Sequence, residues 1–297
     1  MTLEQLRIFV AVAEREHVTR AAADLGIVQS AASAAIAALE TQHGAQLFHR
    51  VGRRIELTES GRVFLVEARA VLARAAAAEL TLSELGGLKR GTLSVHASQT
   101  IGTYWLPPLL AKFRKAHPAI DIRLAIGNTA QVAAAVIAGT AELGFVEGEI
   151  DAPALSIRAI EGDRLAVVIA AEAAPAKPGK LAAADLLAMD WVLREPGSGT
   201  RAEFEAELRR RKIDPAALKV VLELPSNEAV RSAVLAGAGA TAISELVVGP
   251  GLRYGSLKRL DFALPQRPFH ILRHKERYRS RAADALLEII APEKNRK

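Results

Sequence analysis

Four short polar segments of this sequence have the residue types needed to bind a small anion. They span residues 98–100, 127–129, 197–200 and 226–227, and each lies between a strand-like apolar run and a helical run. The free N–H groups of a helix N-terminus attract negative charge, and short polar side chains add donors. Each segment is also compatible with an ordinary helix cap. The candidate ligand-binding residues are Ser98, Gln99, Thr100, Asn128, Thr129, Ser198, Gly199, Thr200 and Asn227.

An α/β fold would bring these four segments together. From Thr92 onward strand-like and helical runs alternate, with a strand at 93–97 before a helix near 105–115, and a strand at 120–126 before a helix at 130–138. This repetition predicts a parallel sheet covered by helices, in which ligands bind at the carboxyl ends of the strands. The remaining length suits two such lobes, with the chain returning to the first lobe at its end.

Motifs of catalysis are absent from the sequence. It contains neither GxxxxGK[ST] nor GxSxG, and Gly237-Ala238-Gly239 follows a helical run, so it is no dinucleotide fingerprint. The absence of Cys excludes disulfides, Cys-ligated zinc and a thiol nucleophile. We expect no enzyme activity, no cofactor and no metal. A solute-binding or enzymatic α/β module with a helical N-terminal appendage remains the alternative.

The N-terminal part has a pattern typical of DNA binding. A helical run from Thr19, its expected N-cap, ends at a glycine turn, and a second run covers 29–40. One face of the second run is apolar, and the other carries small uncharged residues, among them Gln29, Ser30 and Ser33. Two short helices around a glycine turn indicate a helix-turn-helix, whose second helix must approach base edges in the major groove.

A hairpin predicted at 47–57 adds positive charge beside that helix. It holds Arg50, Arg53 and Arg54, and no acidic residue lies between positions 42 and 55. Arginines on such a wing bind phosphates or a narrow minor groove. We therefore expect these three arginines to contact DNA.

A long helix is predicted from Glu59 to about Leu85, with Thr58 as its N-cap. Apolar residues recur along it with the spacing of a heptad repeat, which predicts dimerisation through this helix. Packing of the helix on its own domain is the alternative. The residues of the repeat are Val63, Val66, Ala70, Ala73, Ala77 and Leu80.

Composition and charge limit the class of protein. The net charge of the 297 residues is +6, but residues 267–297 carry +5 of it and residues 1–90 only +1, so the total is weak evidence for nucleic acid. The 58 alanines predict much helix and thin cores. The start of the chain lacks the pattern of a signal peptide, and no apolar run is long enough to span a membrane. We therefore expect a soluble, cytoplasmic protein without membrane contact.

The chain resembles LysR-type transcriptional regulators of bacteria over essentially its whole length. The segments that carry the resemblance in the N-terminal part are Leu3-Glu4-Gln5-Leu6-Arg7-Ile8-Phe9, Val18-Thr19-Arg20-Ala21-Ala22, Gln29-Ser30-Ala31-Ala32-Ser33, Ala38-Leu39-Glu40, Leu47-Phe48-His49-Arg50 and Leu57-Thr58-Glu59-Ser60-Gly61. The resemblance implies a winged helix-turn-helix, a linker helix that dimerises and a two-lobed α/β effector domain of periplasmic-binding-protein type. It also implies homodimers or homotetramers, double-stranded DNA with an inverted-repeat operator, and RNA polymerase as a partner.

The resemblance also implies domain limits and further DNA contacts. The DNA-binding domain would be 1–58 and the linker 59–90. The effector domain would be 91–297, with lobe I about 91–161 plus 267–297 and lobe II about 162–266. By position, Thr19 and Arg20 would lie near phosphate. Many family members have Pro where this chain has Ser30. Many also have Arg where it has Ala34, and the loss of that charged contact implies that the wing carries more of the affinity.

The effector part resembles one branch of the family, which includes regulators of sulfite and sulfur metabolism and of carbon fixation. The segments that match are Ser98-Gln99-Thr100-Ile101-Gly102, Gly127-Asn128, Glu147-Gly148, Arg194-Glu195-Pro196-Gly197-Ser198-Gly199-Thr200-Arg201 and Ser226-Asn227-Glu228-Ala229-Val230. This likeness adds Glu147 to the candidate effector site. It implies a small anion or phosphorylated metabolite as effector, bound between the two lobes and altering operator contacts and bending.

Overall fold

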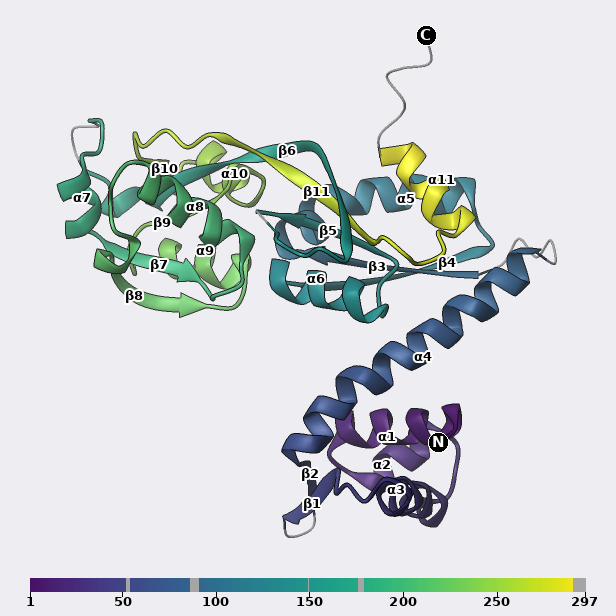
Figure 1. Ribbon diagram of the computed structural model, residues 1–297. Helices are drawn as coiled ribbons and strands as arrows, with labels where there is room; N and C mark the ends of the chain where they lie inside the picture. The colour runs from purple at the N-terminus through teal and green to yellow at the C-terminus, as the bar shows by residue number, and fades with distance from the viewer. Residues whose placement is uncertain (52–53, 86–90, 149, 176–178, 291–297) are drawn as a thin grey trace. The chain divides into compact units, whose positions relative to one another are not determined.

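The computed structural model describes residues 1–51, 54–85, 91–148, 150–175 and 179–290. Contacts within the chain divide it into two compact units, one made almost wholly of residues 1–87 and the other of residues 88–297. Each unit has its own hydrophobic core, and the two are described separately. Figure 1 shows the elements of both.

The N-terminal unit is a helix-turn-helix followed by a hairpin and a long helix. Its elements are α1 (Leu3–Arg15), α2 (Val18–Asp24), α3 (Gln29–His43), β1 (Phe48–Val51), β2 (Arg54–Leu57) and α4 (Glu59–Leu85). The expected N-cap Thr19 is wrong, because α2 begins at Val18 and its cap is His17, whose Nδ1 accepts a hydrogen bond from the N–H of Arg20. His17 has the extended backbone that a cap requires.

The core of this unit combines a few aromatic rings with many small side chains. Phe9 of α1 is fully buried, and its ring centroid lies 5.4 Å from that of Phe48 and 4.9 Å from that of Phe64. On α2 and α3 the buried residues include Ala21 and Ala32, which let the helices approach closely. The small side chains let these helices pack closely around one core.

A single carboxylate fixes the wing beside α3. Glu40 accepts hydrogen bonds from the N–H groups of Leu47 and Phe48, at 2.7 and 3.1 Å. The chain then passes through β1 and β2 to Thr58, whose hydroxyl accepts from the N–H of Gly61. Thr58 thus caps α4 as expected, and the hairpin is held at both ends.

Helix α4 has two unlike apolar faces. On one face, Phe64, Leu65 and Ala68 pack against the core of the N-terminal unit. This face of the helix therefore packs on its own domain, which was the alternative to dimerisation. On the other, the side chains of Val63 and Val66 are 63% and 59% exposed. The exposed face belongs to the expected heptad seam, and nothing in the described chain covers it.

The second unit is built of two α/β lobes joined by two strands that pass through both. Lobe I contains β3 (Gly91–Ser98), η1 (Ile101–Trp105), α5 (Leu106–Ala116), β4 (Ile120–Gly127), α6 (Thr129–Ala138), β5 (Leu143–Glu147) and α11 (Arg281–Ile290). Lobe II contains α7 (Ala183–Ala188), β7 (Asp190–Arg194), α8 (Gly199–Arg210), β8 (Lys219–Leu224), α9 (Asn227–Leu235), β9 (Thr241–Ser244), α10 (Glu245–Arg253) and β10 (Leu257–Arg259). The shared strands are β6 (Leu155–Ala170) and β11 (Gln266–His274).

The sheet order is β10-β6-β11-β5-β3-β4, with β9 also paired to β6, while β7 and β8 form a separate parallel pair. In lobe I the strands β4, β3 and β5 are parallel, and their carboxyl ends meet at one edge of the sheet. Helices α5 and α11 pack on one face of this sheet and α6 on the other. The predicted α/β class is therefore present, and the parallel strands bring the turns after β3 and β4 to the same edge.

The apolar run at 165–170 predicts a short strand there, but β6 begins ten residues earlier, at Leu155. Its first part, from Leu155 to Arg164, pairs antiparallel with β11, and its second part pairs with β9 and β10. The first part was missed because only Leu155 and Asp163 in it are buried, so it has no run of buried apolar residues. The short elements β9, β10, α7 and α10 were also not predicted.

The described chain contains no single helix long and apolar enough to cross a membrane. Helices α2 and α3 reach that length only together, with a bend of 110° between them.

Gly162 lies where β6 and β11 cross from one lobe to the other, and we expect no larger residue to fit there. A Cβ atom at this position would lie 2.1 Å from the carbonyl oxygen of Arg267 and 2.7 Å from the nitrogen of Phe269. Gly162→Ala should therefore lower the free energy of unfolding by about 1–3 kcal/mol. Urea denaturation of the full chain measures this.

The matched control is Gly249→Ala in α10, where a Cβ atom would meet nothing within 4 Å. We expect that variant to be as stable as the parent or up to about 1 kcal/mol more stable, because Ala favours a helix over Gly. Equal stability of the two variants would contradict the close approach at Gly162.

Candidate DNA-binding surface and effector cleft

Helix α3 presents an uncharged polar surface opposite its buried side. Ala32, Ile36 and Leu39 are buried in the core. On the other side Gln29 and Ser30 are exposed, and Ser33 is half-buried. The Nε2 of Gln29 donates to the Oγ of Ser33 at 2.9 Å, so these two side chains form one polar group. An amide and hydroxyls on an exposed helix face can form hydrogen bonds with base edges.

The other candidates lie on α2 and in the hairpin. Thr19 and Arg20 are exposed on α2. Arg50 lies in β1 and Arg54 begins β2, and their side chains are outside the described part. Arg53 also lies outside the described residues. The expected residues of the helix and wing thus belong to one small unit.

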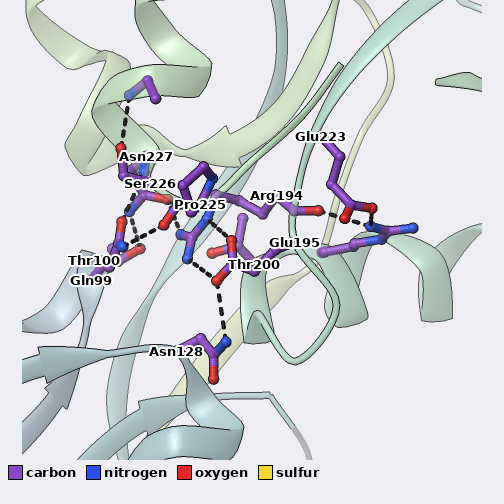
Figure 2. Close-up of polar contacts among 12 residues, drawn as sticks. Gln99, Thr100, Asn128, Arg194, Glu195, Thr200, Glu223, Pro225, Ser226 and Asn227 are labelled. Carbon is purple, nitrogen blue, oxygen red and sulfur yellow. Dashed lines mark hydrogen bonds and ion pairs between the residues drawn. The ribbon is translucent and has the colours of Figure 1, made fainter. Parts of the chain in front are cut away.

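In the second unit, the polar turns expected to bind an effector meet between the two lobes. Gln99, after β3 of lobe I, donates from Nε2 to the carbonyl of Pro225 at 2.8 Å and accepts from the N–H of Asn227 at 2.9 Å. The Nδ2 of Asn227 donates to Thr100 at 3.1 Å, and both side chains are fully buried. Figure 2 shows these contacts. The first turn of α9 is therefore bonded to the carboxyl end of β3.

A second set of contacts surrounds Glu147 at the end of β5. Its carboxylate accepts hydrogen bonds from Ser98 of lobe I and from Thr200 of lobe II, the latter at 3.2 Å. The hydroxyl of Thr129 donates to its backbone carbonyl at 2.8 Å. A Cβ atom at position 199 would lie 2.0 Å from that carbonyl, so only glycine lets α8 come this close. The hydroxyls that we expected to face an anion thus surround a carboxylate of the chain itself.

Arg267 on β11 connects this set to the crossing strands. Its guanidinium binds Asp163 of β6 at 2.5 and 3.1 Å, donates to Thr200 at 3.3 Å and lies 3.9 Å from Glu147. Ser244 donates a further hydrogen bond to Asp163. Burial opposes the charged form of Arg267, but the carboxylates of Glu147 and Asp163 raise its pKa above the usual value. Arg267 therefore stays charged and ties both lobes to the crossing.

Arg194, at the end of β7, forms a third set. Its Nε and Nη2 each donate to Glu195 at 2.8 Å, and its Nη1 donates to Asn227 at 2.6 Å. Asn128 of lobe I donates to Glu195 at 3.2 Å (Figure 2). Burial tends to raise the pKa of Glu195, but the hydrogen bonds from Arg194, its own backbone and Asn128 hold it below the usual value. Glu195 is therefore a carboxylate.

Near the start of α5, one more contact joins the lobes. Tyr104 packs on a core cluster of lobe II, and its hydroxyl donates to Glu228 at 2.9 Å. Burial and the neighbouring carboxylate raise the pKa of Tyr104 to about 12. The tyrosine therefore remains a neutral donor at physiological pH.

All of the expected effector-site residues lie at this junction. The remaining member, Ser198, is buried at the N-cap of α8. The candidate site residues expected from the sequence did not include Arg194, Glu195, Asp163, Arg267 or Tyr104, although Arg194 and Glu195 lie in a segment that resembles the family. For Arg194 and Glu195 a signal existed, since charged residues directly follow the apolar run of β7. Asp163 and Arg267 are 104 positions apart, and their pairing has no local signature.

The described residues hold no group of three His, Cys, Asp or Glu side chains placed to bind a metal ion.

Two family models match the chain. Residues 3–62 match the model described as bacterial regulatory helix-turn-helix protein, lysR family, and residues 86–294 match the LysR substrate binding domain. The chain belongs to the LysR family of transcriptional regulators. This membership sets aside the alternative of an enzyme with a helical appendage.

Similar proteins agree with the family. The uncharacterized HTH-type transcriptional regulator YeiE of Escherichia coli K12 is 34% identical over 294 residues, covering 98% of each chain. A probable RuBisCO transcriptional regulator of Trichormus variabilis is 33% identical over 297 residues, covering 98% of this chain and 88% of that one. The resemblance to a branch that includes carbon-fixation regulators is thereby confirmed.

Solved structures show the same fold. Full-length CbnR, in complex with its target DNA, has a TM-score of 0.71 at 23% identity and covers 98% of this chain and 99% of its own. The regulatory domain of CcmR from Synechocystis PCC6803, in complex with 2-PG, has a TM-score of 0.61 at 25% identity. It covers 70% of this chain and 99% of its own. The expected fold, a helix-turn-helix head and a two-lobed α/β effector domain, is therefore confirmed.

Removal of the Arg267 charge should destabilise this LysR-family chain strongly. Arg267→Met leaves the carboxylates of Asp163 and Glu147 buried without their cation, which costs about 3–5 kcal/mol of unfolding free energy. The control is Arg259→Gln, which breaks a partly exposed ion pair with Glu245. That variant should lose less than about 1 kcal/mol. Urea denaturation distinguishes the two, and similar small losses would contradict the role of Arg267.

Proposed function

We propose that this LysR-type regulator changes its contacts with operator DNA when a small anion binds between the two lobes of its effector domain. The observation that supports this best is the concentration of buried polar groups at the junction of the lobes, where Arg194 and Arg267 lie together with the hydroxyls of Ser98, Thr100, Thr129, Ser198 and Thr200. These groups lie at the carboxyl ends of the strands and at helix N-termini, which is where open α/β folds bind ligands. The similar domain of CcmR was solved in complex with 2-PG, which supports a ligand site in this domain.

The proposed effector site consists of the residues expected from the sequence together with Arg194. The expected residues are Ser98, Gln99, Thr100, Asn128, Thr129, Glu147, Ser198, Gly199, Thr200 and Asn227. They come from both lobes, so an anion bound among them would alter the contacts that hold the lobes together. A ligand shifts such an equilibrium only by its different affinity for the two arrangements.

The proposed DNA contacts divide into two kinds. Gln29, Ser30 and Ser33 on α3 read bases, while Thr19 and Arg20 position the unit on phosphate. Arg50, Arg53 and Arg54 of the wing bind phosphates or the minor groove. The operator would be an inverted repeat, since two heads of a symmetric dimer bind two symmetric half-sites.

The proposed assembly is a dimer of dimers. One pairing uses the seam of α4, formed by Val63, Val66, Ala70, Ala73, Ala77 and Leu80, with the side chain of Leu80 outside the described part. In this proposal the DNA-binding domain is 1–58, the linker is 59–90 and the effector domain is 91–297, with lobe II at about 162–266. Anion binding would rotate the lobes, change the spacing of the heads and alter the bend of the operator. RNA polymerase would respond to that change.

We expect the wing and α3 to affect DNA binding in different ways. Arg50→Gln removes a phosphate contact, so it should weaken binding to all sequences and reduce the salt dependence of affinity by about one counterion. Gln29→Ala should instead reduce the preference for the operator by about 1–3 kcal/mol per base contact. Arg259→Gln, on the other unit, is the control. Titrations with operator and unrelated DNA at several salt concentrations decide this, and equal loss for both DNAs in Gln29→Ala would contradict base reading.

The effector site can be located by thermal stability. Sulfite, sulfate, phosphate, short carboxylates and 2-PG form the ligand panel. A ligand at about one hundred times its dissociation constant stabilises by about 2.7 kcal/mol, which raises the Tm of a domain of this size by about 5–10 °C. Thr100→Val should abolish the rise, whereas Thr92→Val, at the exposed start of β3, should keep it. No rise with any anion, or a rise retained in Thr100→Val, would overturn the proposed site.

A further inference from the structure

The charged side chains at the junction of the lobes sum to a net negative charge. Two guanidinium groups, of Arg194 and Arg267, face three carboxylates, of Glu147, Asp163 and Glu195. An added anion would meet a net negative charge in a poorly solvated place, where Coulomb repulsion is strong. If an anionic effector binds here, as the proposed function holds, one of these carboxylates has to leave.

Arg194 and Asn128 together hold one carboxylate from both sides. The Arg194 side chain is only 4% exposed, and its Nε and Nη2 bind the two oxygens of Glu195 in the parallel arrangement that suits a planar carboxylate. Asn128, from the opposite lobe, donates to the same group. In Figure 2 the Glu195 carboxylate lies between Arg194 and Asn128. The donors therefore form a complete carboxylate-binding subsite.

Of the three carboxylates, Glu195 is the one able to move away. Its side chain is 22% exposed, whereas those of Glu147 and Asp163 are 2% and 5% exposed. Glu147 also accepts from hydroxyls of both lobes, and Asp163 is bound by Arg267 at two atoms. If the Glu195 side chain rotates into solvent, water replaces its hydrogen-bond donors. Arg194 is then free to bind another carboxylate.

We propose that Arg194 and Asn128 are the subsite for a carboxylate group of the effector, and that Glu195 occupies this subsite as an internal counter-ion until the effector displaces it. The effector is thus a small carboxylate. Once bound, it takes over the bridge from Arg194 in lobe II to Asn128 in lobe I. The inference rests on the proposed effector function and assigns its specificity to these three residues.

An internal occupant weakens the measured affinity. The apparent dissociation constant rises by the reciprocal of the fraction of molecules in which the subsite is vacant. If that fraction is about one tenth or less, removal of the Glu195 charge should tighten binding of a carboxylate about tenfold or more. Glu195→Gln tests this, because it preserves the shape of the side chain and removes only its charge.

The experiment is calorimetric titration of the full-length chain with malonate, and with sulfate as a tetrahedral anion for comparison. We expect Glu195→Gln to bind malonate at least about tenfold more tightly than the parent, with a smaller gain for sulfate. The matched control is Glu228→Gln, which also removes a carboxylate from a contact between the lobes, the bond to Tyr104, without touching Arg194. Its malonate affinity should equal that of the parent. Adding Arg194→Lys to Glu195→Gln should reverse the gain in malonate affinity, because Lys cannot form the bidentate pair with a carboxylate.

The outcomes separate the two proposals. Equal malonate affinity of the parent and Glu195→Gln overturns the counter-ion role and leaves the effector function standing. An equal gain in Glu228→Gln also overturns it, because the cause is then a looser contact between lobes. An equal gain for sulfate overturns the assignment to carboxylates. Absence of any anion binding in both parent and variant overturns the effector function together with this inference.

Discussion

The ion pair between Arg267 and Asp163 is the interaction on which the effector domain depends. It lies where β6 and β11 cross between the lobes, and the same guanidinium reaches Thr200 of lobe II and approaches Glu147 of lobe I. A buried cation of this kind is tolerated only while its carboxylates remain in place. The positions of the two lobes and the charges between them are therefore coupled through one side chain.

Local patterns in the sequence were sufficient for the N-terminal unit but only partly for the effector domain. The helix-turn-helix was predictable because helical periodicity and a capping threonine such as Thr58 act over a few residues. The two lobes followed from alternating strands and helices. The first half of β6 was missed because its exposed residues carry no apolar run, and the N-cap of α2 was misplaced at Thr19 because His17 is a rarer cap.

The effector site shows the same division between local and distant information. The polar turns were recognisable from their residue types, and the structure brings Gln99, Asn128 and Asn227 to one junction. What the sequence could not reveal is that the chain supplies its own carboxylates to these donors. Pairings such as Ser98 with Glu147 join residues 49 positions apart and depend on the folded sheet. The hydroxyls therefore face an internal anion, and the candidate site is a self-paired network.

Effector binding is then an exchange of one carboxylate for another on Arg194. The most direct test is a crystal structure of the full chain with a saturating carboxylate effector. We expect the carboxylate of the ligand within hydrogen-bond distance of Arg194 and Asn128, with the Glu195 side chain turned to solvent. A ligand bound between the lobes while Glu195 keeps both of its bonds to Arg194 would contradict it.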